Sequence, residues 1–182
     1  GGEIVEGNDP AKLGRAVKNS VELNGSAAAH LQDGVAVVEF LHWFSSQPAG
    51  SLTEISAAQA LEASRVKVGE RMQNPLKDLS FETISGAGEH AAIMHYRVTT
   101  ESDRAINDGE MFLIDSGAQY VNGTTDITRT VAVGTVSEEQ KRFFTLVLKG
   151  MIAISTARFP KGTRGCDLDP LARIALWKAG AD

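Results

Sequence analysis

Cysteine is nearly absent from this sequence. Cys166 is the only one among 182 residues, so the chain cannot form an internal disulfide bond. No histidine neighbours Cys166 in the sequence, so nothing there would activate its sulfur as a nucleophile. A single ordinary thiol fits the reducing cytosol, and we expect a cytoplasmic protein.

The sequence also lacks an excess of positive charge. Eighteen basic residues face 23 acidic ones, the formal net charge is −5, and no block of like charges stands out. Proteins that bind nucleic acid usually carry a basic patch. We therefore expect no nucleic-acid partner.

Long apolar runs are missing too. No segment approaches the roughly 18–20 apolar residues that cross a membrane, so we expect no membrane partner. The first residues, Gly1 to Ile4, lack the basic and then apolar regions of a signal peptide. Residues 86–88, Gly-Ala-Gly, fit neither a Walker pattern nor a dinucleotide fingerprint, so we expect no phosphate loop.

The sequence does contain the material for one globular core. Hydrophobic residues make up 42% of the chain and charged residues 23%. Apolar spacing, caps and turn residues predict helices over 11–46 and 53–69, a helix after the capping box Ser137–Gln140, and a last helix from Asp167. They predict strands over 81–85, 91–96, 111–114 and 124–133, with a loop over 71–78. This order predicts an α+β fold with an antiparallel sheet flanked by helices.

The helix after Ser137 carries an apolar stripe. Its members recur at helical spacing and predict a face turned towards the core. They are Phe144, Val147, Leu148, Met151 and Ile154.

Two aspartates lie in strand-like sequence. Asp115 directly follows the apolar run 111–114, and Asp126 lies within the Thr- and Val-rich segment 124–133. Strand interiors are depleted in aspartate, so each one needs a reason. One reason is a site for hard divalent cations, which prefer oxygen ligands and can share a carboxylate. The alternative is a strand cap at Asp115 and a surface ion pair between Asp126 and Arg129.

A shared metal site sets a condition on the hairpin. A two-residue turn at Asn122-Gly123 would leave Asp115 four residues beyond the partner of Asp126. That offset is about 13 Å at ~3.3 Å per residue, too far for shared ions. A metal site therefore requires a turn centred near Tyr120-Val121, or a bulge, for which Gly117 is a candidate.

His95 is the third candidate for chemistry. It follows two apolar residues in the segment Ile93-Met94-His95-Tyr96. Taken alone, a histidine in such a strand is either a hydrogen-bonded core or edge residue, or a catalytic residue.

Several motifs together resemble metallopeptidase family M24, in particular its aminopeptidase P branch. The resemblance covers the whole chain and is most specific in the blocks that carry Asp115 and Asp126. The matching segments are 83–86 (Thr-Ile-Ser-Gly), 93–96, 113–120 (Leu-Ile-Asp-Ser-Gly-Ala-Gln-Tyr), 123–131 (Gly-Thr-Thr-Asp-Ile-Thr-Arg-Thr-Val) and, more weakly, 176–180.

The resemblance implies a pita-bread fold with two divalent metal ions, often manganese. Family members hold these ions with two aspartates, one histidine and two glutamates. Asp115 and Asp126 match the two aspartates, the second of them bridging, and His95 matches a histidine beside the scissile bond. The implied reaction is attack by a metal-bridging water that releases the N-terminal residue from a peptide with proline at the second position.

The resemblance also implies that residues 1–182 are the N-terminal part of the pita-bread catalytic domain, namely its first α/β half and the opening helices of the second half. In the family the ligand histidine, both ligand glutamates and further catalytic histidines lie beyond the matched segment. We therefore expect the chain alone to be weakly active or inactive. An incomplete sheet would expose an edge strand and apolar helix faces, so we also expect a homo-oligomer.

Departures from the family pattern leave other functions open. Residues 88–92, Gly-Glu-His-Ala-Ala, differ from the commoner version with proline and asparagine, and Val98 stands where proline is frequent. A prolidase and a methionine aminopeptidase are the alternatives within the family. A third reading is a non-catalytic pita-bread binding module, for which Asp115, Asp126 and His95 together would be unnecessary.

Overall fold

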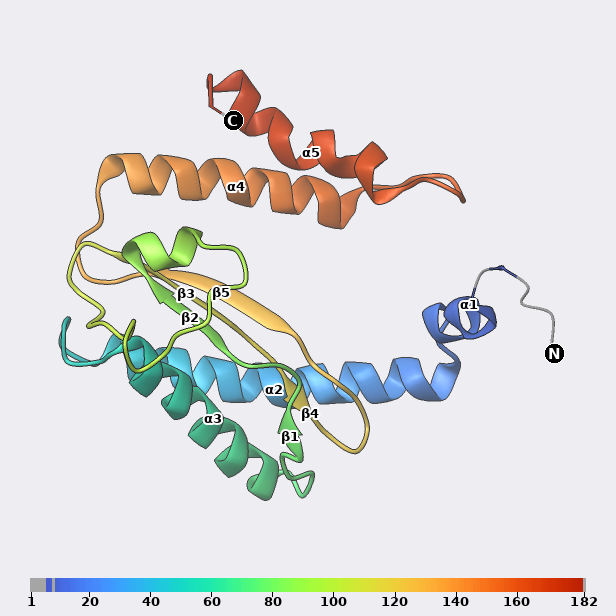
Figure 1. Ribbon diagram of the computed structural model, residues 1–182, viewed down its shortest axis with the longest axis horizontal. Helices are drawn as coiled ribbons and strands as arrows, with labels where there is room; N and C mark the ends of the chain where they lie inside the picture. The colour runs from blue at the N-terminus through green and yellow to red at the C-terminus, as the bar shows by residue number, and fades with distance from the viewer. Residues whose placement is uncertain (1–5, 8, 182) are drawn as a thin grey trace.

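The computed structural model describes residues 6, 7 and 9–181, and it is built in layers (Figure 1). Helices α2 (Ser20–Ser45) and α3 (Glu54–Arg71) lie on one side of a small antiparallel sheet. Helices α4 (Glu138–Thr156) and α5 (Gly165–Lys178) lie on the other side. No helix of the described residues is long and apolar enough to cross a membrane.

The sheet consists of three strands in the order β2-β3-β5. These are β2 (Ile84–Ala87), β3 (Met111–Ser116) and β5 (Ile127–Ala132), and each neighbouring pair is antiparallel. A second, two-stranded sheet pairs β1 (Asp78–Leu79) with β4 (Ala118–Gln119). The predicted antiparallel sheet with flanking helices is therefore confirmed, although β1 begins inside the predicted loop 71–78.

The core lies between this sheet and the α2–α3 layer. Alternate residues of β3, such as Phe112 and Ile114, turn towards the helices and are fully buried. Phe112 stacks on Phe44 of α2 with ring centroids 5.0 Å apart, and Leu61 of α3 belongs to the same cluster. The opposite face of β3, which includes Asp115, is left for α4 and for solvent.

The prediction of one helix over 11–46 was wrong. The chain forms α1 (Pro10–Ala16), breaks, and starts again as α2 at Ser20. The break has a local cause, because the Asn19 side chain accepts hydrogen bonds from the backbone N–H of Val21 and Glu22, while Glu22 caps the Asn19 N–H in return. Such a capping box is a start signal for a helix. The capping box at Ser137–Gln140 was predicted and is confirmed.

The predicted strand over 91–96 was also wrong. Residues Gly88–Ala92 form a short 3-10 helix, η1, and the chain then turns, with His95 at a positive φ of 54°. The predicted strand over 81–85 is displaced, since β2 runs from Ile84 to Ala87. Gly88 follows β2 with a φ of 57°, where the chain turns into η1.

The prediction that the apolar stripe of α4 faces the core was wrong for the part of the chain that the structure describes. The five members of the stripe are between 36% and 57% exposed. The buried side of α4 is instead the small residue Gly150, where a Cβ would lie 2.1 Å from the carbonyl oxygen of Ala172 in α5. Helix α5 therefore packs against the side of α4 that carries Gly150, and the larger apolar residues of the stripe stay partly exposed.

Candidate metal centre

The β3–β5 hairpin decides whether the two aspartates can act together. Asp115 lies opposite Thr128 in the ladder, and Asp126 comes two residues before Thr128, directly ahead of β5. Side chains two residues apart point to the same face, so both aspartates lie on one face, one diagonal step apart. Diagonal neighbours are about 7–8 Å apart, within reach of side chains that converge.

The turn that produces this arrangement differs from both predictions. The loop is Val121-Asn122, closed by a hydrogen bond of 2.9 Å from the Tyr120 N–H to the Gly123 carbonyl. The turn expected at Asn122-Gly123 was therefore wrong by one residue. The turn near Tyr120-Val121, stated above as a condition for a shared metal site, is also one residue away from the observed loop. Asp115 is therefore offset by two residues along the strand from the position opposite Asp126, between the offsets of four and zero that the two expected turns would give. This offset still places both carboxylates on one face.

Gly117 does not form the predicted bulge. The register is the same on both sides of it, because Ser116 pairs with Ile127 and Gln119 pairs with Thr124. Gly117 is needed for another reason. A Cβ at this position would lie 2.0 Å from the Thr125 carbonyl oxygen, so no larger residue fits without moving the strands.

The three residues predicted from the sequence line one cavity of about 320 Å³. Asp115 and Asp126 come from the sheet, and His95 comes from the turn that follows η1. The remaining lining residues are Phe81, Glu82, Ile84 and Arg97. The structure thus brings all three candidate residues to the same place.

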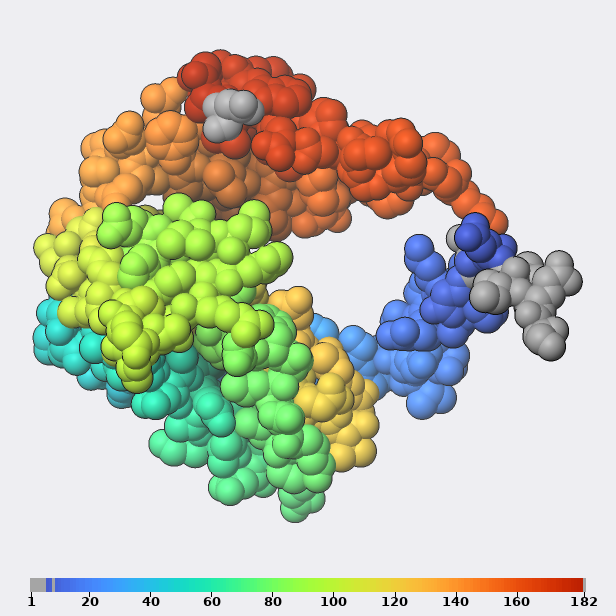
Figure 2. Space-filling view, in the orientation of Figure 1, coloured from blue at the N-terminus to red at the C-terminus, as the bar shows by residue number. Residues whose placement is uncertain are grey.

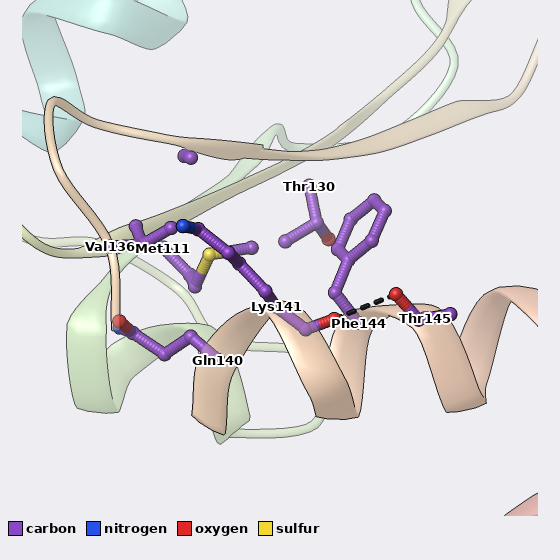
Figure 3. A pocket seen from close by; sticks show the side chains of 8 residues that line it. Met111, Thr130, Val136, Gln140, Lys141, Phe144 and Thr145 are labelled. Atoms are coloured by element: carbon purple, nitrogen blue, oxygen red, sulfur yellow. Dashed lines mark hydrogen bonds between the residues drawn. The ribbon is translucent and has the colours of Figure 1, made fainter. Parts of the chain in front are cut away.

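The far end of this sheet face is covered by α4. Met111, Thr130 and Ala132 lie on the same face as the aspartates and line a largely apolar pocket of about 260 Å³ with residues of α4. Figure 3 shows the Phe144 ring of α4 reaching towards Thr130. Figure 2 shows open space between the α4–α5 pair and the hairpin. One end of the face is therefore packed, and the end with the carboxylates stays accessible.

Asp115 is held by a neighbouring hydroxyl. Thr128 Oγ1 donates a hydrogen bond of 2.7 Å to Asp115 Oδ1. The predicted surface pair between Asp126 and Arg129 is absent, because these two residues lie on opposite faces of β5 and Arg129 donates instead to the Thr128 carbonyl. Asp126 is exposed and makes no ion pair with a described residue. Thr128 was not singled out from the sequence, although a hydroxyl opposite an aspartate is the signal that could have found it.

The loop that carries His95 is anchored by a buried carboxylate. Glu54, the first residue of α3, accepts hydrogen bonds from the Ala87 N–H at 2.7 Å and the Tyr96 hydroxyl at 3.0 Å. His90 Nδ1 lies 2.9 Å from the same carboxylate, and the His90 and Tyr96 rings are 4.5 Å apart. Burial, and after it the hydrogen bond to Glu54 and the Glu54 charge, raise the pKa of Tyr96 above its ordinary value, against a smaller lowering by the hydrogen bond to Ser102. The phenol is therefore protonated at neutral pH and serves as a donor.

The donor atoms of this face fit a hard divalent cation. Both candidate ligands are carboxylates, and one of them is already oriented by a hydroxyl, as metal ligands commonly are. Among residues 6, 7 and 9–181 no group of three or more His, Cys, Asp and Glu side chains could hold a metal ion. The described residues therefore offer two candidate acidic ligands and not a complete ligand set.

Known proteins share both the sequence and the structure. The model of metallopeptidase family M24 matches residues 24–182. Probable Xaa-Pro aminopeptidase P from Metarhizium acridum is 46% identical over 184 residues, which is all of this chain and 29% of that protein. Probable Xaa-Pro aminopeptidase P from Aspergillus clavatus is also 46% identical, with 28% of its length covered. The chain thus spans about 29% of the length of these relatives.

Solved structures agree. X-prolyl aminopeptidase from Caenorhabditis elegans, described as a cytosolic enzyme with a di-nuclear active site, superposes with a TM-score of 0.84 at 40% identity, over 96% of this chain and 28% of that one. Prolidase from Pyrococcus furiosus superposes with a TM-score of 0.76 at 27% identity, over 93% and 46% of the two chains. With its antiparallel sheet between helical layers in the pita-bread arrangement, the chain belongs to metallopeptidase family M24.

Proposed function

We propose that this chain is the first part of the catalytic domain of an Xaa-Pro aminopeptidase, which removes the N-terminal residue from peptides with proline at the second position. The observation that carries the proposal is the cavity shared by Asp115, Asp126 and His95. The relatives that match the whole chain are named for this activity.

Asp115 and Asp126 would hold two divalent metal ions, which we propose to be Mn²⁺. The remaining ligands, in the family one histidine and two glutamates, would come from outside the described residues. Two bound cations lower the pKa of a water molecule and polarise a carbonyl group, which is the chemistry that peptide hydrolysis needs. The role of Thr128 is then to hold the Asp115 carboxylate in one orientation.

His95 would contact the substrate. Its left-handed backbone conformation is uncommon for residues other than glycine, although histidine, asparagine and aspartate adopt it more often than most, and it persists where the surroundings enforce it. The neighbouring Tyr96 supplies that constraint through Glu54. We propose that His95 hydrogen-bonds the carbonyl oxygen of the scissile bond and so positions the peptide against the carboxylates.

A prolidase is the second candidate, because prolidase from Pyrococcus furiosus also superposes over 93% of the chain, with a TM-score of 0.76 against 0.84 for the C. elegans aminopeptidase. The two functions differ in the substrate they accept, since a prolidase cleaves dipeptides. We further propose a cytosolic location, supported by the description of the C. elegans enzyme.

The test uses the natural full-length protein with Mn²⁺ and two substrates, an Xaa-Pro dipeptide and an Xaa-Pro tripeptide. Release of the first residue from the tripeptide is expected. Asp115→Asn and Asp126→Asn should each reduce the rate by at least about a hundredfold, because each removes a charged ligand. Glu139→Gln, an exposed carboxylate in the first turn of α4, is the control and should retain the full rate. Cleavage of the dipeptide alone would favour the prolidase, and no cleavage of either peptide would refute both.

The 182-residue chain provides a second comparison. With two carboxylates and no completing ligands, it should bind Mn²⁺ weakly and cleave neither peptide. Robust turnover by this chain alone would contradict the proposed division of the ligand set.

A further inference from the structure

A buried ion pair lies behind the two candidate metal ligands, on the opposite side of the sheet. Asp33 of α2 and Arg65 of α3 are both 0% exposed, and their side chains meet twice, with Nε to Oδ1 at 2.7 Å and Nη2 to Oδ2 at 3.1 Å. Removing two charges from water costs about as much as such a pair returns, so stability alone does not explain it.

The ion pair contacts the sequence neighbour of each aspartate. Arg65 Nη1 donates to Ser116 Oγ, and Asp33 Oδ2 accepts a hydrogen bond of 2.6 Å from Thr125 Oγ1. Ser116 follows Asp115 in the sequence, and Thr125 precedes Asp126. Successive side chains of an extended chain point to opposite faces. Each buried hydroxyl therefore lies on the opposite face of the sheet from its neighbouring aspartate, where the ion pair binds it.

The backbone ladder is incomplete at this point. Between the Ser116–Ile127 and Gln119–Thr124 pairs, the Ala118 N–H donates to the Thr125 hydroxyl at 2.9 Å and not to a carbonyl. The Thr125 carbonyl accepts from Ser80 Oγ at 2.9 Å. Side chains therefore replace part of the ladder where the spacing of the two aspartates is set.

We propose that Asp33 and Arg65 are positioning residues for metal binding. The pair fixes both hydroxyls to a single rigid group, and thereby holds Asp115 and Asp126 at the separation that two cations need. This inference rests on the proposed function, and it adds to it a pair of residues that touches neither substrate nor metal.

The test replaces the pair by apolar residues, Asp33→Leu with Arg65→Met, in the natural full-length protein. Exchanging both partners leaves no unpaired buried charge, so the fold is expected to survive. The control is the exposed pair between the same two helices, Glu39 and Arg71, changed to Glu39→Leu with Arg71→Met. Like Asp33 and Arg65, Glu39 and Arg71 are 32 residues apart in the sequence, and Arg71 Nη2 lies 2.6 Å from Glu39 Oε1. Their side chains, however, are 56% (Arg71) and 45% (Glu39) exposed.

The readout is Mn²⁺ affinity by calorimetry, beside the peptidase rate. The Asp33–Arg65 variant should bind Mn²⁺ about tenfold to a hundredfold more weakly, which is the usual effect of losing groups that orient metal ligands. Its circular-dichroism spectrum should match that of the wild type. The Glu39–Arg71 variant should bind like the wild type. A folded Asp33–Arg65 variant with wild-type affinity would overturn the proposal.

A second variant covers the case in which the first does not fold. Ser116→Ala with Thr125→Val removes the two attachments to the ion pair and leaves the pair itself in place. It also removes the hydrogen bonds between Ser116 Oγ and Thr83 and between the Ala118 N–H and Thr125. It should lose Mn²⁺ affinity to the same extent, and wild-type affinity here would also overturn the proposal. If the wild type binds Mn²⁺ but cleaves no Xaa-Pro peptide, the proposed function fails while the positioning role stands. A wild type that binds no Mn²⁺ would refute both.

Discussion

Thr128 lies directly opposite Asp115 in the β3–β5 ladder, and its hydroxyl donates a hydrogen bond of 2.7 Å to the Asp115 carboxylate. Thr128→Val keeps the shape of the side chain and removes this donor. We expect Mn²⁺ affinity to fall about tenfold, and the free energy of unfolding to change by at most about 1 kcal/mol, because Thr128 is exposed. Thr130→Val, on the same strand and face, is the control for calorimetry. Equal effects of the two substitutions would show that the hydrogen bond has no special role.

Gly117 lies directly against the backbone of Thr125. In Gly117→Ala the new Cβ would meet the Thr125 carbonyl oxygen at 2.0 Å and Ser80 Oγ at 2.2 Å. We expect a loss of about 2–3 kcal/mol in the free energy of unfolding, measured by urea denaturation. Gly34→Ala, in the middle of α2 with nothing within 4 Å, should instead stabilise the protein by about 0.5–1 kcal/mol. A neutral Gly117→Ala would mean that the strands can separate at no cost.

The Tyr96 hydroxyl links the His95 turn to the buried Glu54 carboxylate. Tyr96→Phe removes this hydrogen bond, so Glu54 loses one of its donors and the turn one of its anchors. We expect the free energy of unfolding to fall by about 1–2 kcal/mol. The peptidase rate of the full-length protein should also fall, with kcat affected more than KM. Lost stability with an unchanged kcat would assign Tyr96 a structural role only.

The free energy of unfolding should depend on pH in the alkaline range through Tyr120. Burial and then the neighbouring Asp33 charge raise the pKa of Tyr120 well above its ordinary value near 10. Because the folded protein holds this proton more tightly than the unfolded chain, the contribution to stability is complete below pH 10 and is lost as the pH rises above 10.

Urea denaturation of the wild type and of Tyr120→Phe between pH 9 and pH 11 measures this contribution. The slope of the unfolding free energy against pH should be shallower in the variant. Identical slopes would mean that Tyr120 ionises in the folded protein as it does in the unfolded chain.

The uncovered apolar residues of α4 should make the 182-residue chain associate with itself. Val147 and Met151 are 57% and 53% exposed on one face of the helix, and contiguous apolar surface of this kind favours association. Sedimentation velocity should detect dimers or larger species of the wild-type chain. Val147→Lys with Met151→Glu should shift them towards the monomer. A monomeric wild-type chain would contradict the expectation.

The sequence was informative where structure is local. The capping box at Ser137 and the apolar run before Asp115 each depend on neighbouring residues, and both predicted their elements correctly. The turn of the hairpin was misplaced because packing against α2 decides it. A Cβ at Gly123 would lie 3.1 Å from Ala29 Cβ, and a Cβ at Gly25 would lie 2.2 Å from the Asn122 carbonyl oxygen. Asn-Gly is a strong turn signal, and tertiary contacts override it here.

The support of the candidate site could not be predicted from the sequence. The contacts of Arg65 and Asp33 with the strands join residues 51 and 92 positions apart, and no local pattern connects them. The turn at His95 likewise depends on Glu54, 42 residues before Tyr96. The candidate residues Asp115, Asp126 and His95 were found because they lie in recognisable motifs, whereas the residues that hold them do not.

The hairpin of β3 and β5 also bears on how the protein is made. Its two arms, which continue past β3 and β5, meet at the short loop Val121-Asn122, and hairpins close in about 1–10 μs. Helices α2 and α3, which contact the hairpin from behind, precede it in the chain and leave the ribosome earlier. Helices α2 and α3 and both arms of the hairpin are therefore outside the ribosome once residue 132 has emerged. The acidic pair can assemble during translation, before α4 and α5 pack onto the sheet.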